Sequence, residues 1–303
     1  MQVIERGWLS SNNILCFEGD LATLVDSGYV AHAAQTVRLI HEALQRQPGS
    51  TRLTRLINTH SHSDHIGGNA ALQRKFGCSI VIPAGSEQMV SDWDEDALLL
   101  NSARQRGERF RHDAVLADYA EFDMGGLQWQ ALPAPGHDMA ALVYYCATER
   151  LLISGDALWN DGFGIIFGAL IGNEHSLRAT RQTLEMISRL AIDTVIPGHG
   201  APFADVDAAL QRAFSRLEAH ENSTSRMGRS AIKACFTFNL LDMERLSEES
   251  LPDYLQSVPF FEQVNARHFG LNSSEFADWL LRDLLASRAI CVKDGWILPT
   301  MSA

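Results

Sequence analysis

The stretch INTHSHSDHIGG, Ile57–Gly68, is the most informative part of this 303-residue chain, because it gathers side chains that commonly bind metal ions into one turn. Within six positions it places three histidines and an aspartate: His60, His62, Asp64 and His65. They follow an apolar, strand-like run that ends at Thr59, so they are predicted to lie in a strand-to-helix loop and to converge. Imidazole nitrogens and carboxylate oxygens suit a divalent metal. The stretch therefore predicts a metal site rather than a polar loop of surface histidines.

Further ligands are expected after later strands, because six positions cannot enclose two metal ions. The motifs APGHD, LLISGDAL and TVIPGHG each follow an apolar run and supply His137, Asp156 and His199. Neighbouring glycines let the backbone approach closely. Each motif alone is weak, but together they predict a site for two divalent metal ions. Zinc is the first choice, and iron and manganese suit the same ligands.

The order of these motifs, HSHSDH, PGH, SGD and PGHG, resembles that of the metallo-β-lactamase superfamily over about residues 1–220. The resemblance implies an α/β protein with a four-layer αβ/βα sandwich and ligands on loops at one edge of two packed sheets. It implies that the first metal is held by His60, His62 and His137, the second by Asp64, His65 and His199, and both by Asp156. It also implies that Asp26 lies near the metals, although a turn-forming role beside Gly28 stays open. Asp138, where glyoxalase II-type hydrolases usually carry threonine, leaves the substrate class open.

The chemistry expected of such a site is hydrolysis. Two metals that share a water lower its pKa toward ~7 and supply a metal-bound hydroxide at neutral pH. We expect this hydroxide to attack the carbonyl of a small ester, thioester or lactone, with Asp64 as the catalytic residue that orients it and moves its proton.

The apolar run after Asp156 is expected to form a hydrophobic wall for an acyl chain or aromatic group. Its members are Trp159, Phe163, Ile165, Ile166 and Phe167. Packing of this run against the C-terminal part is the alternative interpretation. The remaining histidines lack ligand spacing and are expected at the surface; they are His32, His41, His112, His175, His220 and His268.

The chain changes character after about Asp205, where long amphipathic patterns replace alternating strands and helices. It ends in AICVKDGWILP, in which Asp294-Gly295 predicts a hairpin turn. We predict a catalytic domain over 1–220 and a small, mainly helical, winged-helix-like domain over 221–303. This tail resembles that of the lactamase-like protein 2 subgroup, which makes a single-strand endoribonuclease the alternative function. A cap over the catalytic domain or a contact within a homo-oligomer is equally open.

The composition of the chain indicates which classes of binding partner are expected. The net charge of -12, from 37 acidic and 25 basic residues, disfavours nucleic acid and anionic lipid. Five scattered cysteines without C-x-x-C spacing, and charges at Glu5 and Arg6 where a signal peptide would be apolar, predict a cytoplasmic protein. The longest apolar run, GFGIIFGALIG, is too short and glycine-rich to span a membrane. The expected partner is a small-molecule substrate.

Overall fold

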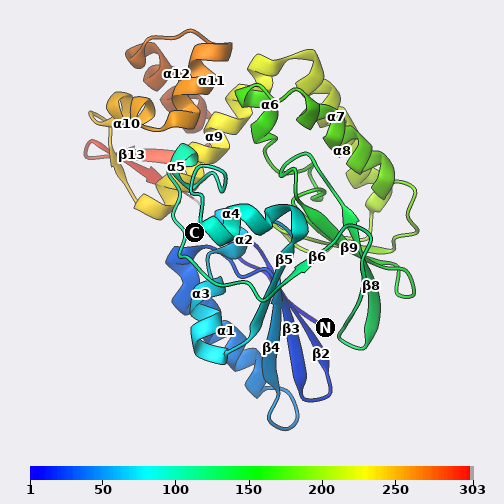
Figure 1. Ribbon diagram of the computed structural model, residues 1–303. Coiled ribbons are helices and arrows are strands. Elements are labelled where there is room, and N and C mark those ends of the chain that lie inside the picture. Colours follow the sequence, from blue (N-terminus) through cyan, green and yellow to red (C-terminus); the bar gives the residue numbers. More distant parts are fainter. Residues whose placement is uncertain (301–303) are drawn as a thin grey trace.

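Two β-sheets packed face to face form the centre of the protein in this computed structural model, which describes residues 1–300 (Figure 1). The first sheet holds, in this order, β1 (Gln2–Ile4), β2 (Asn13–Glu18), β3 (Leu21–Val25), β4 (Arg52–Ile57), β5 (Ser79–Pro83) and β6 (Ala114–Leu116). The second holds β11 (Thr194–Pro197), β10 (Leu151–Gly155), β9 (Leu142–Cys146), β8 (Leu127–Pro133) and β7 (Glu121–Met124). The pairs from β3 to β6 and the pair β10–β11 are parallel, and the others are antiparallel.

Alternating side chains give each sheet two apolar faces. In β2, Ile14 and Cys16 enter the core between the sheets, whereas Leu15 packs on the outer side. In β10, Ile153 enters the same central core and Leu152 faces outward. Both faces of both sheets therefore require cover.

Helices supply that cover on the two outer sides. On the first sheet lie α1 (Ala33–Gln45) and α3 (Asn69–Phe76), and on the second lie α7 (His175–Ile187) and α8 (Val206–Asn222). In α1 the apolar stripe buries Ile40 and Leu44, as a helical period of 3.6 requires. The order helices, sheet, sheet, helices confirms the predicted four-layer αβ/βα sandwich. Shorter helices are α2 (Ser63–Ile66), α4 (Glu87–Asp92), α5 (Leu100–Ala103) and α6 (Phe167–Ile171), with 3-10 turns at Val30–His32 and Ala84–Ser86.

The C-terminal part is mainly helical and ends in a hairpin, as predicted. It comprises α9 (Thr224–Met243), β12 (Leu246–Ser247), α10 (Leu251–Ser257), α11 (Pro259–His268), α12 (Ser273–Ala286), β13 (Ile290–Lys293) and β14 (Trp296–Pro299). Figure 1 shows α10 to α12 gathered at one end of the molecule beyond α9. The hairpin turn places Asp294 at φ 51° and Gly295 at φ 77°, the positive values that a type I′ turn needs. Among residues 1–300, no helix has the length and apolar character needed to cross a membrane.

One apolar core continues from the outer face of the second sheet into these helices. Leu152 of β10, Leu217 of α8, Ile232 of α9 and Phe261 of α11 belong to the same cluster. The division at residue 221 stays a prediction, and α8 runs on to Asn222.

The expectation that all remaining histidines lie at the surface is wrong for His220. Its side chain is buried, because His220 shares the inward face of α8 with Leu217 and Ala213, three and seven residues earlier respectively. Because the surrounding sequence is rich in polar residues, the burial of His220 was not predicted. His41 and His175 are exposed, and His32, His112 and His268 are half-buried.

Candidate metal centre

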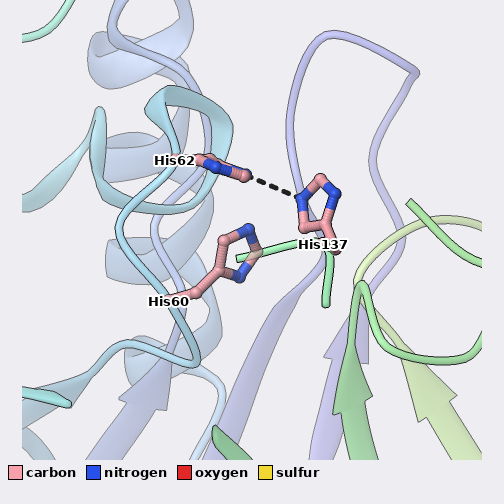
Figure 2. A group of neighbouring side chains, drawn as sticks. All are labelled: His60, His62 and His137. Atoms are coloured by element: carbon pink, nitrogen blue, oxygen red, sulfur yellow. Dashed lines mark hydrogen bonds between the residues drawn. The ribbon is translucent and has the colours of Figure 1, made fainter. Parts of the chain in front are cut away.

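All seven side chains singled out in the sequence meet at one edge of the two sheets. One ligand atom from each of His60, His62 and His137 lies within 4.8 Å of the others, and the same holds for Asp64, His65, Asp156 and His199. Figure 2 shows the first group, in which Nδ1 of His62 lies 2.7 Å from Nε2 of His137. The loops that carry them follow β4, β8, β10 and β11, so each ligand candidate sits beyond the carboxyl end of a strand.

Asp156 faces both groups. Its Oδ2 lies 3.4 Å from Nε2 of His137, and its Oδ1 lies 3.4 Å from Nε2 of His65. Trp159 donates its indole N–H to Oδ1 over 3.1 Å, which fixes the carboxylate plane. In the second group, Oδ2 of Asp64 lies 2.9 Å from Nε2 of His199. The geometry matches a carboxylate shared between two cations.

Two buried nitrogens test whether a metal ion fits. Nε2 of His60 and Nε2 of His65 are shielded from solvent and have no hydrogen-bond partner in the described part of the chain. An unsatisfied buried polar atom costs about 1–3 kcal/mol, and a cation bound through the nitrogen lone pair removes that cost. Burial lowers the pKa of His62 and of His137 to about 4, so both rings are neutral at pH 7, the form that binds metal. The first group fits a divalent metal ion.

The second group carries an excess of negative charge. Burial works to lower the pKa of His65, but Asp26, Asp156 and Asp64 outweigh it and raise that pKa well above its ordinary value. Burial works to raise the pKa of Asp156, yet His65 and His199 hold it well below its usual range. These carboxylates stabilise positive charge at their centre, and a divalent cation supplies more of it than a proton does.

Asp26 holds the ligand loop in place, in line with the expectation that it lies near the metals. Its Oδ2 accepts hydrogen bonds from Nδ1 of His65 and Oγ1 of Thr59, both over 2.8 Å, and its Oδ1 accepts from the Thr59 amide over 2.9 Å. With Nδ1 of His65 engaged, its Nε2 is left to face Asp156. The backbone of Asp26 has φ 57°, a conformation rare outside glycine, and the three hydrogen bonds compensate for that strain.

Small residues and Asp138 shape the other ligand loops. A Cβ added at Gly198 would collide with Oδ1 of Asp156, and one at Gly164 would collide with the ring of His137. Nδ1 of His137 donates to the Ile165 carbonyl over 2.6 Å, which directs Nε2 toward the centre. Asp138 accepts from the Ala140 amide over 2.7 Å and braces the turn that presents His137.

A cavity of about 150 Å³ opens on this centre. Its floor is formed by His62, Asp64, His137 and Asp156. Its walls are formed by Trp8, Leu99, Gln105, Trp159, Phe163, Ile165, Phe167, Arg216, Ala234, Cys235 and Phe238. The predicted hydrophobic wall is thus present in four of its five members. Ile166 is the exception, because it points away from its neighbour Ile165 into the core beneath, where it is 2% exposed.

Several wall residues were not predicted from sequence patterns. Trp8 packs its ring 5.5 Å from that of His199, and Leu99 reaches the cavity from the segment before α5. Arg216 belongs to α8 and Cys235 to α9. No motif surrounds these residues, and the apolar period of α9 indicates only that one face is buried.

Comparisons with known proteins identify the family of the chain. The model of the metallo-beta-lactamase superfamily matches residues 6–199, so the chain belongs to that superfamily. A metallo-beta-lactamase family protein from Thermus thermophilus has the same fold with a TM-score of 0.56 at 19% identity, over 95% of this chain and 93% of that one. The shared fold therefore includes the C-terminal part.

Curated relatives carry the names of hydrolases. A hydroxyacylglutathione hydrolase from Methylococcus capsulatus is 29% identical over 178 residues, which cover 55% of this chain and 60% of that protein. The same name belongs to a protein from Rhodopseudomonas palustris that is 30% identical over 116 residues, 38% of each chain. The chain thus spans less than two thirds of either relative. The probable metallo-hydrolase YqgX from Bacillus subtilis is 28% identical over 66% of this chain and 89% of its own. All three relatives are thus named as hydrolases, and one of them as a metallo-hydrolase.

Proposed function

We propose that the protein is a metal-dependent hydrolase of small carbonyl substrates, with acyl thioesters ahead of esters and lactones. The observation that carries the proposal is the position of Asp156, which faces both ligand groups at the floor of an apolar cavity. A hydroxyacylglutathione is itself a thioester, so the names of the relatives favour this substrate class.

The seven side chains are proposed as ligands of two divalent cations. His60, His62 and His137 hold one, Asp64, His65 and His199 hold the other, and Asp156 serves both. Zinc is the first candidate because the set consists of imidazoles and carboxylates, and iron and manganese are the others. When bound, the cations polarise the substrate carbonyl and acidify a water molecule.

Asp64 is the proposed catalytic residue. It lines the cavity, and burial, which would raise the pKa of its carboxyl, is outweighed by His65 and His199, which keep that pKa below its ordinary value. An ionised Asp64 can orient the attacking water, take its proton as the C–O bond forms, and return that proton to the departing thiolate as the C–S bond breaks. Phe163, Ile165 and Phe167 offer the acyl group an apolar surface and exclude other water.

Thioester turnover with and without a chelator tests this proposal. We expect hydrolysis of short acyl thioesters, its loss on chelation and its return with zinc, iron or manganese. Asp64→Asn should lower kcat by roughly 10²- to 10⁴-fold, because it removes the proton acceptor and keeps the shape. The matched control Asp161→Asn changes a carboxylate whose side chain is 86% exposed and should have no effect.

A single-strand RNA in the same assay tests the alternative endoribonuclease. The net charge of -12 weighs against a bound phosphate backbone, and so does the cavity wall, on which Arg216 is the one lysine or arginine among residues 1–300. RNA cleavage that disappears in Asp64→Asn, without turnover of any thioester, ester or lactone, would overturn the proposal.

A further inference from the structure

Arg216 lines the cavity without a charged partner. Two other arginines of α7 and α8 are paired: Arg181 lies 2.6 Å from Glu221, and Arg212 binds the carbonyl of Asn160 over 2.7 Å. Among residues 1–300, no carboxylate lies within 4.0 Å of the Arg216 guanidinium, and no hydrogen bond engages it. Burial lowers the pKa of Arg216, and no neighbouring acid offsets that effect. A cation therefore stands unneutralised in the wall of the proposed active site.

The segment after β10 packs against this guanidinium. Cζ of Arg216 lies over the ring of Phe163, 5.1 Å from its centroid, a cation–π contact. Gly162, at φ 130°, leaves the space the arginine occupies, because a Cβ there would lie 2.8 Å from its Nη1. Because no hydrogen bond within residues 1–300 engages the Arg216 N–H groups, they can donate to a bound anion.

A partly buried charge without a counter-ion is costly to maintain, and an arginine fork presented to a cavity is suited to a carboxylate or another planar anion. The cavity of about 150 Å³ has the size that encloses a benzene ring, so the enclosed part of a substrate is small. We propose that Arg216 binds a negatively charged group of the substrate, so that the enzyme prefers small acyl thioesters that carry an anion. This inference rests on the proposed thioesterase function.

The anion can belong to the acyl group or to the thiol, and matched substrates separate the two. S-succinyl-N-acetylcysteamine carries its charge on the acyl group, and its methyl ester is the neutral match. S-butanoyl-3-mercaptopropionate carries its charge on the thiol, and its methyl ester is the neutral match. We expect kcat/KM to favour one of the anionic members by roughly 10- to 100-fold, mainly through KM.

Arg216→Met should remove that preference, because methionine keeps an apolar side chain of similar reach and loses the charge. Arg216→Lys should keep part of it, since an ammonium attracts the anion without the planar fork. Arg212→Met is the matched control, because Arg212 lies one turn earlier on α8 outside the cavity, and it should leave the ratio unchanged. A structural role alone would lower turnover of the anionic and neutral members alike.

Binding gives a second measurement that does not depend on turnover. Succinate, but not succinamide, should raise the midpoint of thermal unfolding of the wild-type protein and of Arg216→Lys, and not that of Arg216→Met. Equal kcat/KM for charged and neutral thioesters would overturn the role of Arg216 and leave the thioesterase standing. If no thioester is hydrolysed, the proposed function fails. Independently of that result, the anion site would be overturned if succinate stabilised Arg216→Met as much as it stabilises the wild type.

Discussion

The floor and the walls of the cavity are built in opposite ways. The floor belongs to the two ligand groups, whose polar side chains lie on loops that follow β4, β8, β10 and β11 and are held by hydrogen bonds such as that from His65 to Asp26. The walls are mostly apolar and come from the N-terminal loop, the segment before α5, the run after β10, and helices α8 and α9. We infer that the loops at the ends of the strands carry the proposed reaction, whereas the segments packed over them select the substrate. Changes in the floor should abolish hydrolysis, and changes in the walls should redirect it.

The largest effect is expected for the carboxylate shared by both ligand groups. Asp156→Asn keeps the shape but weakens the bond to each cation, so kcat/KM for the preferred thioester should fall on the order of 10³-fold or more. Kinetics and metal content of the purified variant measure it, with Asp161→Asn as the control. A loss smaller than tenfold would show that Asp156 is not shared between two cations.

A smaller loss is expected from the layer behind the ligands. Asp26→Asn places an amide where three donors converge, so it disturbs His65 and Thr59 while every proposed ligand remains. Metal affinity should fall by roughly 10- to 100-fold. Titration of the apo-protein with zinc against a competing chelator gives the affinity, and an unchanged value would mean that the ligand loop is rigid without Asp26.

The same contrast explains what the sequence could predict. His60, His62, Asp64 and His65 lie within one turn, and the later ligand candidates each follow an apolar run, so local patterns were enough to predict the ligand set. The four-layer fold was predicted from the resemblance of these motifs to a known superfamily. Strands β1, β2, β6 and β7 were not predicted. Of these, β1, β6 and β7 are only three or four residues long, too short for an alternation of apolar and polar residues to stand out. Trp8, Leu99 and Arg216 reach the cavity only through long-range packing, and nothing beside them in the sequence marks their position. The burial of His220 likewise depends on how α8 packs in the folded protein.

The pH dependence of stability tests the packing of α8, which carries both His220 and the wall residue Arg216. Burial, with smaller contributions from Arg216 and Arg226, lowers the pKa of His220 to about 4, so the folded protein keeps this ring neutral while the unfolded chain protonates it near pH 6.5. The native state binds fewer protons, and the free energy of unfolding should therefore fall as the pH drops from 6.5 toward 4. Denaturant unfolding at pH 7 and pH 5 measures this change. Between these two pH values the free energy of unfolding should fall by about 1–2 kcal/mol less in His220→Gln than in the wild type. Equal losses would contradict the buried neutral state.

The smallest effect is expected for the apolar wall itself. Leu99→Ala enlarges the cavity at the segment before α5, so it should favour longer acyl chains by roughly fourfold in kcat/KM per added methylene. A series of straight-chain acyl thioesters measures it, with Leu285→Ala, an exposed residue of α12, as the control. An unchanged chain-length profile would place the acyl group elsewhere.

The central claim is that two cations share Asp156 among seven ligands. Elemental analysis of freshly purified protein, never exposed to chelator, tests it most directly. We expect about two equivalents of zinc, iron or manganese per chain, and both should be lost in a protein that lacks Asp156 and the ligand candidates beside it. Wild-type protein that folds normally and carries no transition metal would contradict it.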